Sequence, residues 1–353
     1  MTNKIRVLVI DDSALVRQIL TQGLNMDPAI EVVGSAADPY IARDKILQLK
    51  PDVLTLDVEM PKMDGIEFLR RLMPQYPLPV VMVSSLTQKG KQITLDALDA
   101  GAVDFVTKPT SNVAQSLSTM ILALCEKVKI ASRANVSRWK KDRETIKKEI
   151  PAAKREFLAN STDKVIAIGA STGGTEAIKK VITLYPADMP GVVIVQHMPS
   201  GFTRMFAERL NQLCAMEVKE AETGDRVRQG LILVAPGGKH LRVKRSGGTY
   251  QVLCQEGEKV NGHCPSVDVM MESVAREVGP NAVGIMLTGM GGDGANGMLE
   301  MRKAGARNIA QDEESSVVFG MPKVAYEKGG AERLVPLDQI ANVTFQLLTE
   351  LGK

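Results

Sequence analysis

Five side chains in the first third of the chain are of the types that a phosphoryl-accepting site needs. Each follows a short apolar run: Asp11 and Asp12, then Asp57, Ser84 and Lys108. Three neighbouring carboxylates repel one another unless a proton or a hard cation intervenes, and oxygen ligands of this kind suit Mg²⁺. In such a pocket we expect Asp57 to be the nucleophile, with the metal and Lys108 offsetting charge on the transferred oxygens. The alternative is that the aspartates only cap the helices that follow them.

A serine, a histidine and an aspartate in the second half of the chain have the types of a hydrolytic triad. Ser171 lies in a glycine-rich turn after an apolar run, His197 ends a second run, and Asp293 lies in a glycine-rich loop after a third. We expect Ser171 to be the nucleophile, His197 the general base and Asp293 the group that orients the imidazole. Oxyanion donors are expected at backbone amides near Thr172 and Met290.

Each member of this triad also has an alternative interpretation. The glycine-rich turn around Ser171 could cradle a phosphate group, His197 could be a core histidine bonded to backbone, and Asp293 could belong to an ordinary turn. The other two histidines, His240 and His263, lie in predicted loops and neither ends an apolar run. The order Ser–His–Asp differs from that of α/β-hydrolases, so the triad is expected on a different scaffold.

The elements that position these residues are predicted to be short apolar strands alternating with amphipathic helices, such as those over residues 13–26 and 65–73. Continuous apolar strands are typical of parallel sheets covered by helices on both faces, where ligands bind at the carboxyl ends of the strands. The sequence therefore predicts an α/β protein with two doubly wound parallel-sheet domains. The expected strands are residues 6–10, 31–35, 52–56, 80–83, 102–106, 164–170, 192–195, 231–235 and 283–288.

A basic segment separates the two halves. Residues 127–156 contain eleven Lys or Arg against four Asp or Glu, and they include Trp139, the one tryptophan of the chain. We interpret residues 126–159 as a linker between domains at 1–125 and 160–353. A nucleic-acid-binding segment is the alternative, and a transcription factor that used it would show salt-dependent DNA binding.

The composition limits the class of protein. The chain has 353 residues, of which 44% are hydrophobic and 24% charged, which is ordinary for a globular protein of about two domains. No apolar run approaches the roughly 18 residues that a membrane span needs, and the amino terminus does not have the pattern of a signal peptide. The four cysteines show no C-x-x-C spacing. We expect a cytoplasmic protein that neither inserts into membranes nor binds nucleic acid.

The first half, over about residues 4–124, resembles a response-regulator receiver domain, which has a flavodoxin-like fold. The resemblance implies that Ser84 is the switch hydroxyl, that Phe105 lies at the aromatic switch position, and that a chemotaxis histidine kinase is the phosphodonor. The matching segments are Val9-Ile10-Asp11-Asp12-Ser13, Leu56-Asp57-Val58-Glu59-Met60-Pro61-Lys62-Met63-Asp64-Gly65 and Thr107-Lys108-Pro109.

The same resemblance assigns roles within the acidic pocket. Asp57 is the implied phosphoacceptor, and Asp11 and Asp12 help it to hold Mg²⁺. Lys108 is implied to contact the phosphoryl group. These roles agree with those expected from the residue types alone, with Mg²⁺ as the cofactor of phosphorylation.

The second half resembles the catalytic domain of the chemotaxis protein-glutamate methylesterases. The resemblance implies hydrolysis of γ-glutamyl methyl esters on the cytoplasmic domain of chemoreceptors, with release of methanol, and deamidation of specific receptor glutamines. Both reactions pass through an acyl-enzyme, so one triad serves both without a cofactor. The matching segments are Ile168-Gly169-Ala170-Ser171-Thr172-Gly173-Gly174, Gln196-His197-Met198, Ala235-Pro236-Gly237, Pro265-Ser266-Val267-Asp268 and Thr288-Gly289-Met290-Gly291-Gly292-Asp293-Gly294.

Two functional hypotheses of different class follow. The first is a phosphorylation-controlled esterase and amidase whose receiver covers the Ser171 cleft until Asp57 is phosphorylated. The second is a receiver-controlled binding module whose glycine-rich loops hold a phosphate or a nucleotide. Turnover of a simple activated ester that is lost on Ser171→Ala distinguishes the esterase from the binding module.

Overall fold

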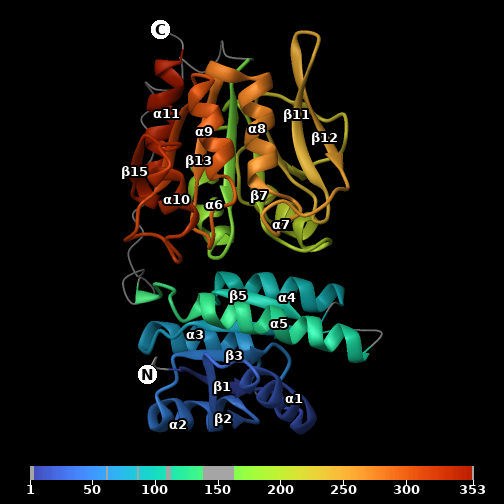
Figure 1. The fold of residues 1–353 in the computed structure, drawn as a ribbon, viewed down its shortest axis with the longest axis vertical. Coiled ribbons are helices and arrows are strands. Elements are labelled where there is room, and N and C mark those ends of the chain that lie inside the picture. The colour runs from blue at the N-terminus through green and yellow to red at the C-terminus, as the bar shows by residue number, and fades with distance from the viewer. Residues whose placement is uncertain (1–3, 61–62, 86, 109–112, 138–162, 352–353) are drawn as a thin grey trace. The chain divides into compact units, whose positions relative to one another are not determined.

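The computed structural model describes residues 4–60, 63–85, 87–108, 113–137 and 163–351, and it divides into two compact units, Met1–Thr145 and Ile146–Lys353 (Figure 1). Trp139 and most of the basic segment lie outside the described residues. The last helix of the first unit, α5 (Val113–Ala131), continues past residue 125. The exact domain boundaries stay a prediction.

The first unit contains a five-stranded parallel sheet in the order β2-β1-β3-β4-β5, which is the flavodoxin-like order. The predicted doubly wound fold is confirmed here. Helices α1 and α5 pack against each other, as do α3 and α4. The strands are β1 (Ile5–Ile10), β2 (Ile30–Ala36), β3 (Val53–Asp57), β4 (Val80–Ser84) and β5 (Asp104–Thr107), and the other helices are α1 (Ala14–Asn25), α2 (Pro39–Leu49), α3 (Gly65–Gln75) and α4 (Gln88–Asp99).

The second unit contains a seven-stranded sheet, also parallel throughout, in the order β15-β14-β13-β6-β7-β10-β8. Helices α8 and α9 lie side by side and both contact β13, while α6 and α11 contact each other (Figure 1). The strands are β6 (Val165–Ala170), β7 (Gly191–Gln196), β8 (Glu217–Glu220), β10 (Leu231–Val234), β13 (Ala282–Met286), β14 (Arg307–Gln311) and β15 (Arg333–Val335), and the helices are α6 (Gly174–Ile182), α7 (Phe202–Asn211), α8 (Val267–Glu277), α9 (Ala295–Lys303), α10 (Met321–Glu327) and α11 (Ile340–Glu350).

Burial on both faces explains why the continuous apolar runs of the sequence form parallel strands. Every residue of β3, β4, β6, β7 and β13 is buried, because each strand has neighbours on both sides and helices cover the sheet. A strand buried on both faces has no solvent face to carry polar residues. None of the described helices is long and apolar enough to cross a membrane.

A three-stranded antiparallel sheet in the second unit was not predicted. It consists of β11 (His240–Ser246), β12 (Thr249–Gln255) and the short β9 (Arg226–Val227). His240, expected in a loop, is the first residue of β11, so that prediction was wrong. The physical reason is a hairpin: Gly247 and Gly248 form its two-residue turn, which Gly-Gly pairs favour, and β11 packs on α8.

Candidate functional site

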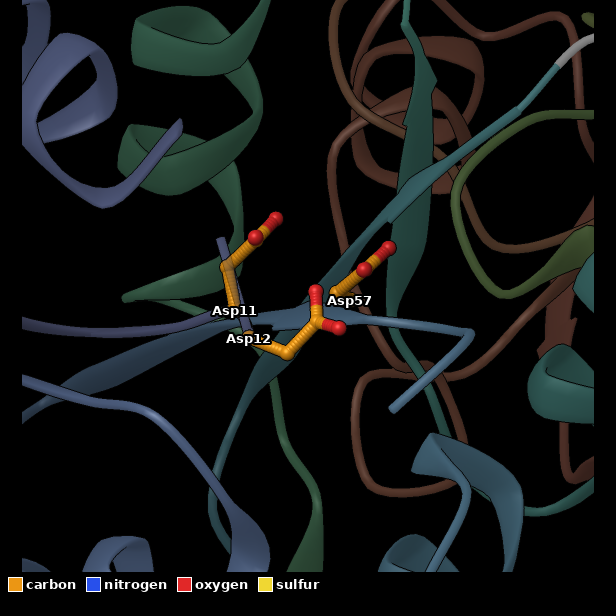
Figure 2. A group of neighbouring side chains, drawn as sticks. All are labelled: Asp11, Asp12 and Asp57. Atoms are coloured by element: carbon orange, nitrogen blue, oxygen red, sulfur yellow. The ribbon is translucent and has the colours of Figure 1, made fainter. Parts of the chain in front are cut away.

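The predicted acidic pocket forms at the carboxyl edge of the first sheet. Asp11 and Asp12 follow β1, Asp57 ends β3, and these two strands are neighbours. The ligand oxygens of the three carboxylates lie within 4.8 Å of one another, and Figure 2 shows the side chains grouped there. Asp11 and Asp57 are buried and Asp12 is exposed. The helix-cap alternative fails for Asp12, because Ser13 is the residue that caps α1.

Lys108 lies between two of these carboxylates. Its Nζ is 3.0 Å from Asp11 Oδ2 and 2.9 Å from Asp57 Oδ1. Burial raises the pKa of Asp57 to about 6, although the nearby ammonium of Lys108 acts in the opposite direction. Burial alone would lower the pKa of Lys108, but Asp57 and Asp11 outweigh it and raise that pKa. The pocket therefore holds a permanently charged cation beside a carboxylate that is easily protonated.

Ser84 ends β4 at the same edge of the sheet, and its hydroxyl is fully buried. It bonds to the hydroxyl of Thr94 on α4, which in turn donates to the Gly90 carbonyl at 2.7 Å. The Gly90 carbonyl is closer to Thr94 than to Ser84, at 2.7 Å against 3.3 Å, which favours Thr94 as the donor to Gly90 and Ser84 as the donor to Thr94. The hydroxyl predicted to act as the switch is thus bonded to α4 rather than to Asp57, and no sequence pattern pointed to Thr94.

Phe105, the predicted aromatic switch residue, is buried in β5. Lys127 of α5 lies with its Nζ 5.9 Å from the centre of this ring, within the range of a cation–π contact, and 2.6 Å from Asp104 Oδ1. A single cation therefore links β5 to α5 next to the ring.

The three predicted triad residues follow neighbouring strands of the second sheet. Ser171 comes directly after β6, and β6 pairs with β7 on one side and β13 on the other. His197 follows β7, and its backbone N–H donates to the Ala170 carbonyl at 3.1 Å. The imidazole Nε2 lies 2.8 Å from Asp293 Oδ2, in the loop between β13 and α9. The structure therefore brings His197 and Asp293, the predicted base and orienting carboxylate, into direct contact beside the Ser171 turn.

Asp293 is buried and surrounded by donors. Its Oδ1 accepts hydrogen bonds from Ser266 Oγ at 2.7 Å and Asn261 Nδ2 at 2.8 Å, and its Oδ2 accepts from Val267 N at 2.7 Å. Burial alone would raise the pKa of Asp293, but the bonds from His197, Asn261 and Ser266 outweigh it and hold that pKa far below its ordinary value. An ordinary turn would not need this number of donors on one carboxylate.

The second ring nitrogen of His197, Nδ1, is the one that Asp293 does not contact. Nδ1 is buried and has no hydrogen-bond partner within the described parts of the chain. A core histidine satisfied by backbone, the alternative interpretation, would have both nitrogens bonded. Asp293 engages Nε2. If His197 is the general base, as predicted, Nδ1 is therefore the nitrogen that would take the proton from Ser171, and such catalytic bonds often tighten only when substrate binds.

The other two histidines play different parts. His240 is buried, donates from Nε2 to the Glu258 carbonyl at 2.8 Å and accepts at Nδ1 from Ser266 N at 3.2 Å, as a structural core histidine does. His263 lies parallel to His197, with ring centroids 3.6 Å apart and an interplanar angle of 9°. Substitution of either histidine would therefore disturb the surroundings of the triad, His240 through Ser266 and His263 through His197.

The predicted oxyanion positions border Ser171. A Cβ atom on Gly289 would lie 2.7 Å from Ser171 Cβ, which is too close for any residue other than glycine. The backbone beside Met290 can therefore approach the serine closely. Thr172 is buried, and its carbonyl accepts from Thr288 Oγ1 at 3.0 Å. The donors themselves stay a prediction.

Sequence reasoning missed the residues that support Asp293. Asn261 and Ser266 lie between β12 and α8, and Ser266 is also the N-cap of α8. The available signals were the Asn-Gly pair at 261–262, which favours a tight turn, and a serine directly before a helix. Neither signal says which side chain the turn or cap will meet.

Comparison with known proteins gives consistent matches for both units. Residues 166–344 match the CheB methylesterase family, and residues 7–120 match the response regulator receiver domain. The protein-glutamate methylesterase/protein-glutamine glutaminase of Syntrophotalea carbinolica is 71% identical over 350 residues, 99% of each chain. A protein of Syntrophomonas wolfei with the same name, numbered 2, is 55% identical over 99% of each chain. The crystal structure of the Thermotoga maritima CheB methylesterase catalytic domain matches 53% of this chain and 99% of its own, with a TM-score of 0.52 and 37% identity.

Proposed function

Since the chain belongs to the CheB methylesterase family and carries a response-regulator receiver domain, we propose that it demethylates and deamidates chemoreceptors under the control of phosphorylation. Its substrates are γ-glutamyl methyl esters and specific glutamines of the receptor cytoplasmic domain. The observation that carries the assignment of chemistry to residues is the bond between His197 and the buried Asp293, beside the Ser171 turn.

The ester reaction begins at Ser171. Its Oγ attacks the carbonyl carbon of the methyl ester while His197 Nδ1 takes the hydroxyl proton, and Asp293 stabilises the imidazolium that forms. We expect backbone amides near Thr172 and Met290 to stabilise the developing oxyanion. When the tetrahedral intermediate collapses, the bond to the methoxy oxygen breaks and His197 returns the proton, which releases methanol.

The acyl-enzyme is then hydrolysed by water. His197 takes a proton from the water, the oxygen of which attacks the acyl carbon, and the proton returns to Ser171 as the receptor carboxylate leaves. Deamidation differs only in its leaving group, because ammonia departs in place of methanol. Asp293 remains ionised throughout, as its low pKa requires.

In this proposal, phosphorylation in the acidic pocket controls the esterase. A carboxylate oxygen of Asp57 attacks the phosphorus of a phosphohistidine on the kinase, and the bond between that phosphorus and the histidine nitrogen breaks, so the kinase histidine leaves. Lys108 pairs with the transferred oxygens. Asp11, Asp12 and Asp57 fit Mg²⁺, because their oxygens are hard ligands within 4.8 Å of one another. The ion, when bound, offsets negative charge on the phosphoryl oxygens.

Methanol release from methylated receptor membranes tests this function. We expect release that rises when a small-molecule phosphodonor and Mg²⁺ are added, and that Ser171→Ala abolishes under both conditions. Asp57→Asn should retain the basal rate and lose the response to the phosphodonor. Methanol release by Ser171→Ala at the rate of the unaltered protein would disprove the assignment.

A further inference from the structure

A tight turn between β12 and α8 contacts two members of the triad. Val260 and His263 exchange backbone hydrogen bonds of 3.0 and 2.9 Å, and the two residues between them, Asn261 and Gly262, have φ values of 52° and 81°. Positive φ at both central residues is the signature of a type I′ turn, for which Asn-Gly is the preferred sequence. The local sequence therefore fixes the shape of this turn.

The amide of Asn261 fastens the turn to the triad carboxylate. Its Nδ2 donates to Asp293 Oδ1 at 2.8 Å and to Asp268 Oδ2 at 2.7 Å, so both amide protons are used. Asp268 is itself buried and accepts from Gly297 N of α9 at 2.7 Å. The turn is thus held to the starts of both α8 and α9.

The next side chain after this pair, His263, covers the ring of His197. The centroid distance of 3.6 Å at an angle of 9° is van der Waals contact over the whole ring face. His197 is held by a hydrogen bond at Nε2, while Nδ1 has no partner within the described residues. A single hydrogen bond does not by itself fix the plane of an imidazole ring, whereas a flat surface packed against the ring face does.

We propose that the Asn261-Gly262 turn is a positioning element of the esterase, in which His263 keeps the His197 ring in the plane that both Asp293 and Ser171 require. The inference rests on His197 being the general base. Proton transfer needs Nδ1 aimed at the Ser171 hydroxyl at the moment of attack, and small errors of placement cost rate steeply. In this proposal His263 acts through His197.

The test compares His263→Ala with His263→Phe in the full-length protein, on a small activated ester. His263→Ala removes the covering ring, so kcat should fall by about tenfold or more with KM unchanged. His263→Phe keeps a flat ring without nitrogens and should retain most of the kcat. The low-field proton NMR signal of the His197–Asp293 bond should broaden in His263→Ala and persist in His263→Phe.

Controls separate this inference from the proposed function. Lys259→Ala changes an exposed residue beside the turn and should leave kcat unaltered. A His263→Ala enzyme within twofold of the unaltered kcat would overturn the inference, and so would a His263→Phe enzyme as slow as His263→Ala. If His197→Ala is inactive in either case, the assigned base stands and only the role of the turn fails. An active His197→Ala would instead refute the proposed function.

Discussion

At the scale of single residues, Asp293 is a carboxylate kept ionised by protein donors in place of water. Asparagine at this position has the same shape but only one acceptor oxygen, and its NH₂ group would face either the His197 N–H or the Ser266 hydroxyl. We expect Asp293→Asn to lower kcat for methanol release by about 10²–10⁴-fold with little change in KM. Ser171→Ala should be slower still, since the nucleophile itself is lost. A kcat for Asp293→Asn within tenfold of the unaltered enzyme would count against the role of orienter.

Asp57 gives a pH prediction whose sign follows from its raised pKa of about 6. Below that pH the carboxyl group is largely neutral and attracts Mg²⁺ less, and above it the carboxylate is charged. The affinity for Mg²⁺, measured by titration calorimetry on the unphosphorylated protein, should therefore fall as the pH is lowered from 7.5 to 5.5. Asp57→Asn should remove most of this pH dependence, and an affinity that is equally pH-dependent in that variant would contradict the prediction.

Some site residues could be predicted from the sequence and others could not, depending on whether a strand end or a tertiary contact positions them. Ser171 and His197 each come at the end of an apolar run. Because the carboxyl ends of parallel strands meet at one edge of the sheet, the sequence alone is enough to predict that these two residues lie there. Asn261 and Ser266 belong to a connection whose path depends on the packing of the hairpin and α8. Their approach to Asp293 is a tertiary contact that no local pattern encodes.

At the scale of elements, the contact between β4 and α4 holds the hydroxyl of Ser84, the predicted switch residue. Thr94→Val keeps the shape of the side chain and removes the group to which Ser84 donates, a bond worth about 0.5–1.5 kcal/mol. The state in which Ser84 turns toward a phosphorylated Asp57 should then be easier to reach. We expect methanol release by Thr94→Val to reach half-activation at a lower phosphodonor concentration, by up to about tenfold.

The double variant provides the control for this prediction. With Ser84→Ala the hydroxyl is absent, so Thr94→Val should no longer shift the phosphodonor response. A shift of the same size in both backgrounds would mean that Thr94 acts through the general stability of α4 and not through Ser84.

The β11–β12 hairpin gives a stability prediction. His240 joins the start of β11 to the Glu258 carbonyl and the Ser266 N–H, both at buried or partly buried positions. His240→Ala leaves these groups without their partner, which typically costs about 1–3 kcal/mol. Thermal unfolding should show a lower Tm for His240→Ala than for Lys259→Ala. An unchanged Tm would show that water replaces the ring.

Element prediction succeeded for apolar strands and failed where polar side chains are buried. Strand β14 was missed because Asn308 and Gln311 interrupt its apolar pattern, yet both are fully buried. Asn308 Nδ2 donates to the Met298 carbonyl at 2.8 Å and the Gly330 carbonyl at 3.1 Å. A buried amide is tolerated only when the fold supplies such partners, and the sequence alone does not show them.

At the scale of the whole molecule, all the residues assigned to ester hydrolysis and their described partners belong to the second unit. The fragment 160–353 should therefore be catalytically competent. If the first unit excludes receptor from Ser171 until Asp57 is phosphorylated, the fragment should release methanol from receptor membranes faster than the unphosphorylated full-length protein. Each factor of ten in activation corresponds to about 1.4 kcal/mol in the balance between the covered and open states.

A small ester serves as the matched comparison for this prediction. Its hydrolysis should differ less between fragment and full-length protein, because a small molecule passes a barrier that stops a receptor helix. A fragment no faster than the unphosphorylated protein on receptor would exclude simple inhibition and favour direct activation by the first unit.

The hydrogen bonds that close around Asp293 within a single unit also bear on how such enzymes evolve. A gene fusion that replaced the first unit would leave the bonds from His197, Asn261 and Ser266 intact. Recombination can thus replace the regulatory unit without any compensating change in the catalytic residues. Mutations that tune the response to a kinase and mutations that tune hydrolysis can then lie on separate parts of the gene.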